Sequence, residues 1–147
     1  MAVGSDGARR LEESAREAME RAYAPYSRFR VGAAVRGGDG RIATGCNVEN
    51  AAYPAGICAE RAAVAAAVVQ GVSALEEMVV VTEADAPTPP CGMCRQVLYE
   101  MAPALELTSL TTQGGRGRWR IADLLPHPFT SGALEHRSAR QDRNQDR

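Results

Sequence analysis

Apolar positions near the start of the chain recur at helical spacing and then give way to two strand-like runs. The spacing of three or four residues predicts an amphipathic helix from about Ala8 to Ala22, which Pro25 should end. Its apolar positions are Leu11, Ala15, Ala18, Met19 and Ala22. Residues 1–7 are small and polar and should precede the helix as a loose leader. The runs 31–35 and 41–48 flank a Gly-Gly-Asp-Gly turn, which predicts a β-hairpin.

The rest of the chain alternates helices and strands. An Ala- and Val-rich run predicts a helix over 58–70 with Gly71 as its stop, and a loop over 49–57 precedes it. The further expected elements are a strand over 77–82, a helix over 91–101, strands over 105–112 and 118–121, and a helical turn over 123–126. This order predicts an α/β fold, a three-layer α/β/α sandwich with a mixed five-stranded sheet. We expect a single domain over 1–134 and a polar, disordered tail over 135–147.

Composition and charge narrow the class of protein. The chain is 45% hydrophobic and 24% charged, with a net charge of −1, which argues against a nucleic-acid or membrane surface. The longest apolar stretch, Ala62 to Val69, is too short to span a bilayer, and the N-terminus lacks the pattern of a signal peptide. The four cysteines are therefore expected to be reduced thiols of a cytoplasmic protein.

Three of these cysteines and one glutamate form the most informative pattern. Cys58-Ala59-Glu60-Arg61 is followed some thirty residues later by Pro90-Cys91-Gly92-Met93-Cys94. Cys58, Cys91 and Cys94 fall at predicted helix starts, where backbone N–H groups and the helix dipole favour thiolates. Three thiolates would bind one Zn²⁺ per chain and leave a fourth position for water, as in catalytic zinc sites. Glu60 is then the expected general acid/base beside that water.

Three thiolates on one Zn²⁺ leave a net charge of −1, which opposes ionisation of the water. We expect Arg61 to donate hydrogen bonds to the thiolates and offset this charge, with Arg95 as a second candidate. Two other interpretations stay open from the residues alone. The cysteines could be buried apolar thiols, or Glu60 or Cys46 could close a purely structural zinc site.

The two histidines lack ligand spacing. His127 lies between two prolines and His136 lies in the polar tail, so both are expected at the surface.

Several longer motifs resemble the small homotetrameric cytidine deaminases, over roughly residues 8–130. They are Tyr23-Ala24-Pro25-Tyr26-Ser27-Arg28-Phe29, the stretch from Gly45 to Pro54, Cys58-Ala59-Glu60-Arg61, Pro90-Cys91-Gly92-Met93-Cys94-Arg95-Gln96-Val97, and Leu124-Leu125-Pro126 with Phe129. The resemblance implies zinc-dependent hydrolytic deamination of cytidine and 2′-deoxycytidine to uridine and 2′-deoxyuridine plus ammonia, in pyrimidine salvage. It also implies a homotetramer with active sites shared between subunits.

The resemblance assigns substrate contacts to individual residues. It implies that Asn47 and Glu49 hold the sugar 3′-hydroxyl, that Phe29 lines the base pocket, and that Tyr53 and Phe129 reach over from a neighbouring subunit. On spacing alone, Asn47 and Glu49 could equally be turn or cap residues, and each phenylalanine could be core. The N–H of Ala59, at a helix start, is a further expected contact to the base.

The sequence departs from the family pattern at three places. Pro89 stands where a Ser or Thr is common, Arg30 replaces a common Pro, and Ala62 replaces a common Thr. Three rival functions remain. They are a deaminase of a modified cytosine nucleoside such as a blasticidin-type antibiotic, a polynucleotide deaminase, and a non-catalytic zinc-binding module. Polynucleotide deaminases usually carry His at the position of Cys58 and need a basic groove, which this chain lacks.

Overall fold

The structure, a computed structural model, describes residues 3–135 and contains a five-stranded mixed sheet. The strand order is β2-β1-β3-β4-β5, in which only β3 and β4 pair in parallel. The elements follow the expected order and are α1 (Val3–Met19), β1 (Val31–Gly37), β2 (Ile42–Cys46), the 3₁₀ turn η1 (Tyr53–Ala55), α2 (Ala59–Val69), β3 (Leu75–Thr82), α3 (Gly92–Met101), β4 (Glu106–Thr111), β5 (Arg116–Arg120) and α4 (Ile121–Leu124). The predicted mixed five-stranded sheet is confirmed.

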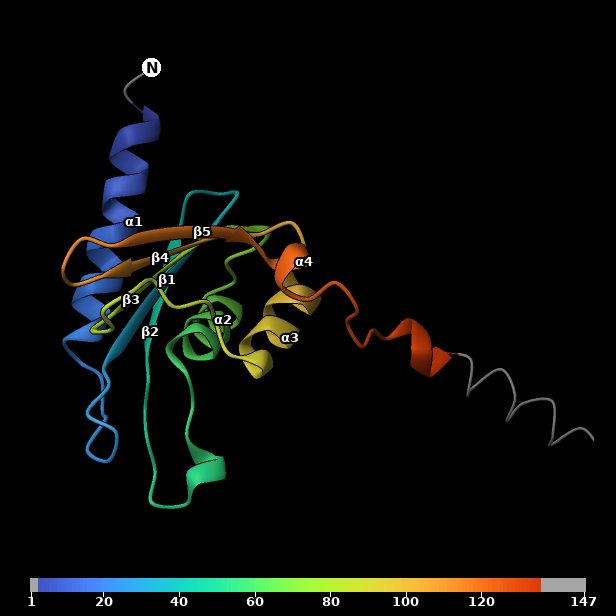
Figure 1. Ribbon diagram of the computed structural model, residues 1–147. Coiled ribbons are helices and arrows are strands. Elements are labelled where there is room, and N and C mark those ends of the chain that lie inside the picture. Colours follow the sequence, from blue (N-terminus) through green and yellow to red (C-terminus); the bar gives the residue numbers. More distant parts are fainter. Residues whose placement is uncertain (1–2, 136–147) are drawn as a thin grey trace, which may run out of the picture.

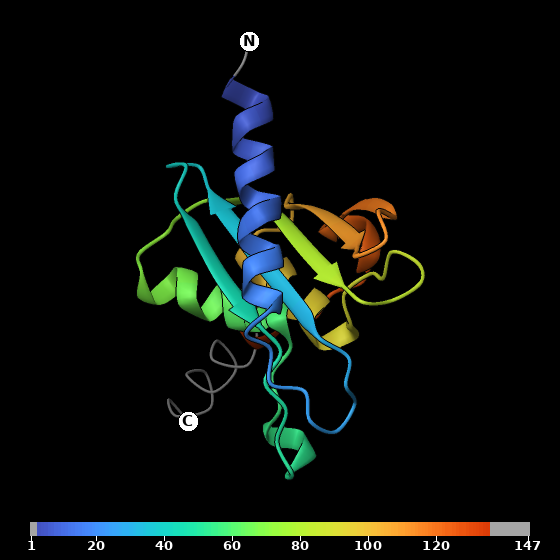
Figure 2. The same ribbon diagram turned by 90° about the vertical axis from the view of Figure 1, so that its left-hand side faces the viewer.

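Helices cover both faces of this sheet. Figure 1 shows α2 and α3 on one side of the sheet and α1 on the other, and Figure 2 shows α1 crossing in front of the strands. Two apolar clusters correspond to the two interfaces. The larger cluster joins α2 and α3 to the sheet, and the smaller one joins α1 to it through Leu11, Ala15 and Met19. The three-layer α/β/α architecture is therefore confirmed.

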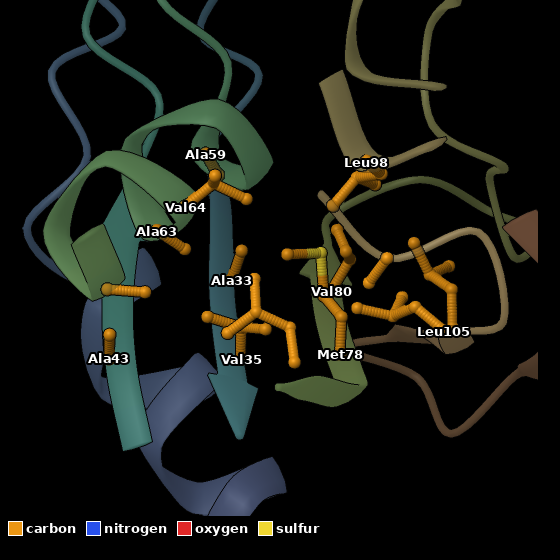
Figure 3. Close-up of a cluster of buried hydrophobic side chains, with 14 of the residues drawn as sticks. Ala33, Val35, Ala43, Ala59, Ala63, Val64, Met78, Val80, Leu98 and Leu105 are labelled. Carbon is orange, nitrogen blue, oxygen red and sulfur yellow. The ribbon is translucent and has the colours of Figure 1, made fainter. Parts of the chain in front are cut away.

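Small side chains set the distance between the sheet and its helices. Ala33, Val35 and Ala43 of β1 and β2 face Ala63 and its neighbours on α2 (Figure 3). At Gly45 the backbones approach so closely that an added Cβ would lie 2.3 Å from the amide nitrogen of Ala63. Such contact is possible only for glycine, and it fixes the start of α2, which carries Cys58 and Glu60, against the sheet.

Helix α1 differs from its predicted bounds at both ends. It begins at Val3, so the expectation of a leader over 1–7 is wrong for the described residues 3–7. An ion pair of 2.6 Å between Asp6 and Arg9, and the acidic charge of Asp6 in the first turn, stabilise this end. The helix ends at Met19, well before Pro25, because the backbone of Tyr23 pairs with that of Val48 instead. That pairing joins residues distant in sequence and is invisible to a periodicity argument.

The C-terminal elements are shifted by a few residues. Strand β5 spans Arg116–Arg120 where a strand over 118–121 was expected, and α4 spans Ile121–Leu124 where a helical turn over 123–126 was expected. The predicted tail lies outside the described residues apart from Glu135, and so does His136. Within the described part of the chain, none of the helices combines the length and the apolar character needed to cross a bilayer.

Candidate active site

The starts of α2 and α3 bring three thiols together. Cys58 is the N-cap residue of α2 and Cys91 the N-cap residue of α3, both with extended backbone, and Cys94 lies in the first turn of α3. Their Sγ atoms all lie within 4.8 Å of one another, and those of Cys58 and Cys91 are 3.8 Å apart. The predicted convergence of the two cysteine motifs is thus present in the fold.

The geometry and the donor set fit a zinc ion. Tetrahedral Zn²⁺ with Zn–S bonds of about 2.3 Å places its sulfur ligands about 3.8 Å apart, which matches the Cys58–Cys91 separation. Within residues 3–135, this is the single group of three or more His, Cys, Asp or Glu side chains with ligand atoms so close together. Neither Glu60 nor Cys46 belongs to it, so the chain offers three ligands and leaves a tetrahedral position free.

Arg61 lies against the thiols, as the charge argument predicts. Its Nη2 is 3.9 Å from Cys58 Sγ, and its Nε is buried with no hydrogen-bond partner among the described residues. A hydrogen bond from Cys94, together with those from Arg61 and Cys91, lowers the pKa of Cys58 to about 5. The same bond to Cys58, together with burial, raises the pKa of Cys94. The Arg61 guanidinium next to Cys58 thus favours the thiolate form of that residue, which is the form that binds a metal ion.

Glu60 is buried beside the thiol cluster. Only 6% of its surface is exposed, although it is an acid in the first turn of α2. Burial raises the pKa of its carboxyl group, and the negative charge of Cys58 raises it further, while a hydrogen bond from Cys94 acts in the opposite direction. A raised pKa makes a carboxylate a better proton acceptor, and the carboxyl group that forms can donate the proton again, which is what a general acid/base requires.

A cavity of about 710 Å³ opens next to the thiols. Of the residues predicted to form the site, it includes Asn47, Glu49, Tyr53, Cys58 and Arg61. The other lining residues are Tyr26, Ser27, Val48, Asn50, Pro54, Gly56, Ile57 and Met93. The other predicted site residues are not among them, namely Phe29, Ala59, Glu60, Cys91, Cys94 and Phe129. The sequence did not predict a site role for Tyr26, Ser27 or Met93, because nothing local to these residues indicates a cavity.

The side chains of Asn47 and Glu49 brace the segment before β1. Asn47 accepts a hydrogen bond from the Val31 amide at 2.8 Å and donates one to the Phe29 carbonyl at 2.7 Å. Glu49 accepts from the amides of Tyr26 and Ser27 at 2.9 and 3.1 Å. A hydrogen bond from the Ser27 side chain, together with these amides, lowers the pKa of Glu49 and keeps it ionised. Both residues therefore have two roles. Their side chains line the cavity, and their hydrogen bonds hold the 26–31 backbone in place.

The predicted aromatic contacts are largely exposed. Tyr53 is 78% exposed, Phe129 62% and Phe29 38%. The rings of Tyr26 and Tyr53 meet edge to face with centroids 6.2 Å apart. The exposure of Phe129 excludes its core-packing alternative, and Phe29 lies on the surface next to Asn47. Ala59, by contrast, is fully buried as the first residue of α2, where helix N–H groups have no acceptor within the helix.

Arg95 does not take the position expected for a partner of the thiolates. Its Nε donates to the Pro90 carbonyl at 2.7 Å and its Nη1 to the Leu124 carbonyl at 3.2 Å. The reason is geometric. The Arg95 guanidinium lies near two backbone carbonyls that accept no hydrogen bond within a helix, one just before α3 and one at the end of α4. His127 is exposed, as expected.

Comparison with known proteins agrees with this site. The family model described as the cytidine and deoxycytidylate deaminase zinc-binding region matches residues 6–105. A cytidine deaminase of Sporosarcina psychrophila is 41% identical over 128 residues, which cover 86% of this chain and 94% of that protein. A cytidine deaminase of Mycobacterium tuberculosis strain H37Rv is 45% identical over 119 residues, 81% of this chain and 86% of that protein.

The fold is also that of solved structures of similar proteins. The crystal structure of cytidine deaminase from Burkholderia pseudomallei superposes with a TM-score of 0.79 at 44% identity, covering 82% of this chain and 98% of that one. The crystal structure of cytidine deaminase from Mycobacterium tuberculosis gives a TM-score of 0.71 at 41% identity, covering 83% and 96%. With the family model matching from α1 to the loop between α3 and β4, and the zinc-binding thiols in place, the chain belongs to the family of zinc-binding cytidine and deoxycytidylate deaminases.

Proposed function

We propose that this protein catalyses the hydrolytic deamination of cytidine and 2′-deoxycytidine to uridine and 2′-deoxyuridine plus ammonia. The observation that carries the proposal is the buried carboxyl group of Glu60 beside a three-thiol metal site that opens next to a cavity. A structural zinc module has no use for a buried carboxyl group outside its ligand set, because burying it costs free energy. The pyrimidine product suits a role in salvage, in the cytoplasm.

Zinc held by Cys58, Cys91 and Cys94 would supply a water whose pKa is lowered enough to act as nucleophile at C4 of the base. Glu60 takes a proton from the attacking water and delivers it to ring N3. Glu60 then takes the second proton, that of the new C4 hydroxyl group, and passes it to the amine at C4, which leaves as ammonia while the C4 carbonyl forms. Because Glu60 is buried, its proton is not exchanged with bulk water between these steps. The charge of Arg61 next to Cys58 offsets the negative charge of the ligands.

The sugar is held by Asn47 and Glu49. Both line the cavity, two residues apart on an extended segment, and their amide and carboxylate groups offer a donor and acceptors to a hydroxyl group. Their hydrogen bonds to the 26–31 segment fix the orientation of these groups before substrate arrives. Phe29 and the N–H of Ala59 complete the contacts to the base.

The active form is a homotetramer with shared sites. The segment around η1 projects from the body of the molecule, and the chain after α4 leads away from it (Figure 1). These segments carry Tyr53 and Phe129, whose exposed rings support contacts to the active site of a neighbouring subunit. A neighbouring subunit would also close the wide cavity around a nucleoside.

The experiment is to add purified, zinc-replete protein to cytidine and follow the loss of the cytidine absorbance band, with Glu60→Gln in parallel. We expect conversion to uridine with equal release of ammonia by the natural protein, and a loss of turnover of at least about a hundredfold in the variant. Equal turnover by Glu60→Gln would refute the role of Glu60.

The rival functions are separated by the same assay. A panel with 2′-deoxycytidine and a blasticidin-type cytosine nucleoside distinguishes the proposed substrates from a modified one. Conversion of the modified nucleoside alone would replace the proposal by the antibiotic-deaminase reading. One tightly bound zinc per chain without conversion of any substrate would leave the zinc-binding module.

A further inference from the structure

Arg95 joins two segments that are far apart in the sequence. Its Nε donates at 2.7 Å to the carbonyl of Pro90, the residue directly before the ligand Cys91. Its Nη1 donates at 3.2 Å to the carbonyl of Leu124, the last residue of α4. The planar guanidinium has several donors in fixed directions, so one side chain can satisfy both carbonyls at once.

Few other hydrogen bonds hold the loop that presents Cys91, in which Pro90 is buried. Pro87, Pro89 and Pro90 have no amide hydrogen, so none of them can donate a backbone hydrogen bond. The Thr88 amide donates to the buried hydroxyl of Ser109 on β4 at 3.0 Å. The loop is therefore held to the sheet through Thr88 and to α3 through the bond between Pro90 and Arg95.

We propose that Arg95 is a positioning residue that holds the Pro90–Cys91 loop in the geometry needed for metal binding and fastens α4 to the same helix. Cys91 is the N-cap residue of α3 and has an extended backbone. Because Pro90 directly precedes it, the position of Pro90 sets where the chain enters α3 and where the thiol of Cys91 lies. Cys94 needs no such help, since it is fully buried within the first turn of α3. Cys91 is exposed and is the ligand that depends on the loop.

The neighbouring residue provides a natural comparison. Gln96 Nε2 donates to the Phe129 carbonyl at 2.8 Å, so it also ties the C-terminal segment to α3, but within the described residues its side chain makes no hydrogen bond to the Pro90–Cys91 loop. Removing Gln96 should therefore loosen the C-terminal segment alone, whereas removing Arg95 should also affect the metal site.

The test measures the rate at which the zinc-loaded protein releases its metal to an excess of a chromogenic chelator, a readout that does not require any enzymatic activity. We expect Arg95→Ala to release zinc about tenfold faster or more, the scale found when groups that orient metal ligands are removed. Arg95→Lys, whose single ammonium cannot bridge both carbonyls in the same way, should fall between Ala and the natural protein. Gln96→Ala should release zinc at the natural rate.

A second control removes an arginine elsewhere in the fold. Arg36→Ala loses a partly buried ion pair of 2.8 Å to Glu77, between β1 and β3, and should lower stability without changing zinc release. Zinc release by Arg95→Ala within twofold of that by Arg36→Ala would overturn the proposal. A natural release rate in Arg95→Lys would show that bridging of the two carbonyls is not needed and would overturn it equally. Both results stand whether or not the protein deaminates cytidine.

Discussion

Asn47 illustrates how one residue can serve the fold and the proposed site together. Its amide group makes two hydrogen bonds to the backbone at Phe29 and Val31, and the same side chain lines the cavity. The alternatives that the sequence left open for this residue are thus not exclusive. The structural role keeps the amide in one orientation, and a fixed orientation is what recognition of a sugar hydroxyl requires.

Replacing Asn47 should therefore affect both stability and substrate binding. Asn47→Ala leaves the Val31 amide and the Phe29 carbonyl without partners, so we expect a loss of about 1–3 kcal/mol in the free energy of unfolding. The KM for cytidine should rise at the same time. Urea unfolding and steady-state kinetics measure the two effects.

Asn50→Ala is the matched control. Asn50 accepts an exposed hydrogen bond from the Ala52 amide. The Asn50→Ala variant should therefore lose well under half as much free energy of unfolding as Asn47→Ala. An equal free energy of unfolding for Asn47→Ala and Asn50→Ala would show that Asn47 does not brace the 26–31 segment.

At the scale of elements, the position of α2 against β2 decides where Glu60 and Cys58 lie. This position depends on Gly45, where any side chain would run into the backbone of α2, within 2.6 Å of the Ala59 carbonyl and 2.7 Å of the Ala62 carbonyl carbon. Backbone atoms of a packed helix cannot yield as the end of a flexible side chain can. The helix itself must move away from the sheet and carry the site with it.

Gly45→Ala should therefore cost about 2 kcal/mol or more of stability and lower the rate of deamination. Thermal unfolding and kcat measure the two effects. Gly92→Ala is the control, because a Cβ at this first residue of α3 meets no atom within 4 Å. Equal stability of the two variants would show that α2 can shift without cost.

At the scale of the whole molecule, an ion pair connects the residue before β1 to the residue after β3, the central strand of the sheet. The guanidinium of Arg30, just before β1, lies 2.6 Å from the carboxylate of Glu83, just after β3, and 3.5 Å from that of Glu20. A side-chain hydrogen bond from Arg30 lowers the pKa of Glu83 below its usual 4.5. This pair occupies the position at which the sequence departs from the family by replacing a common proline with Arg30.

The lowered pKa of Glu83 predicts a pH dependence of stability. In the unfolded chain Glu83 takes up a proton near pH 4.5, whereas the folded state resists protonation to lower pH. Its contribution is therefore complete above about pH 4.5 and is lost as the pH falls through the folded-state pKa. We expect Glu83→Gln to lower the Tm by about 1–3 °C near neutral pH, as is usual for a largely solvated pair, and by less at pH 3.

The check is a series of thermal unfolding curves between pH 3 and pH 7. Glu76→Gln removes an exposed carboxylate of β3 and serves as the control for the loss of one negative charge. A constant difference between natural protein and Glu83→Gln across the series would contradict the proposed linkage.

The sequence by itself determined the types and order of the elements and the ligand set of the metal site. Periodicity and turn residues are local properties, so they predicted the α-β-β-α-β-α-β-β order from neighbouring residues alone. The thiols were equally readable, because Cys58 and Cys91 are helix N-caps and Cys94 lies one turn beyond Cys91. Motifs shared with the cytidine deaminases identified the family over most of the chain.

Only the tertiary structure decided the interactions between residues that are distant in the sequence. The backbone pairing of Tyr23 with Val48 ends α1 early, and Asn47 and Glu49 turn out to brace the 26–31 segment. Arg95 binds carbonyls and not thiolates, because the chain folds Leu124 back onto α3. Each of these contacts depends on where a remote backbone group lies in space, and a local pattern of residue types carries no information about that position.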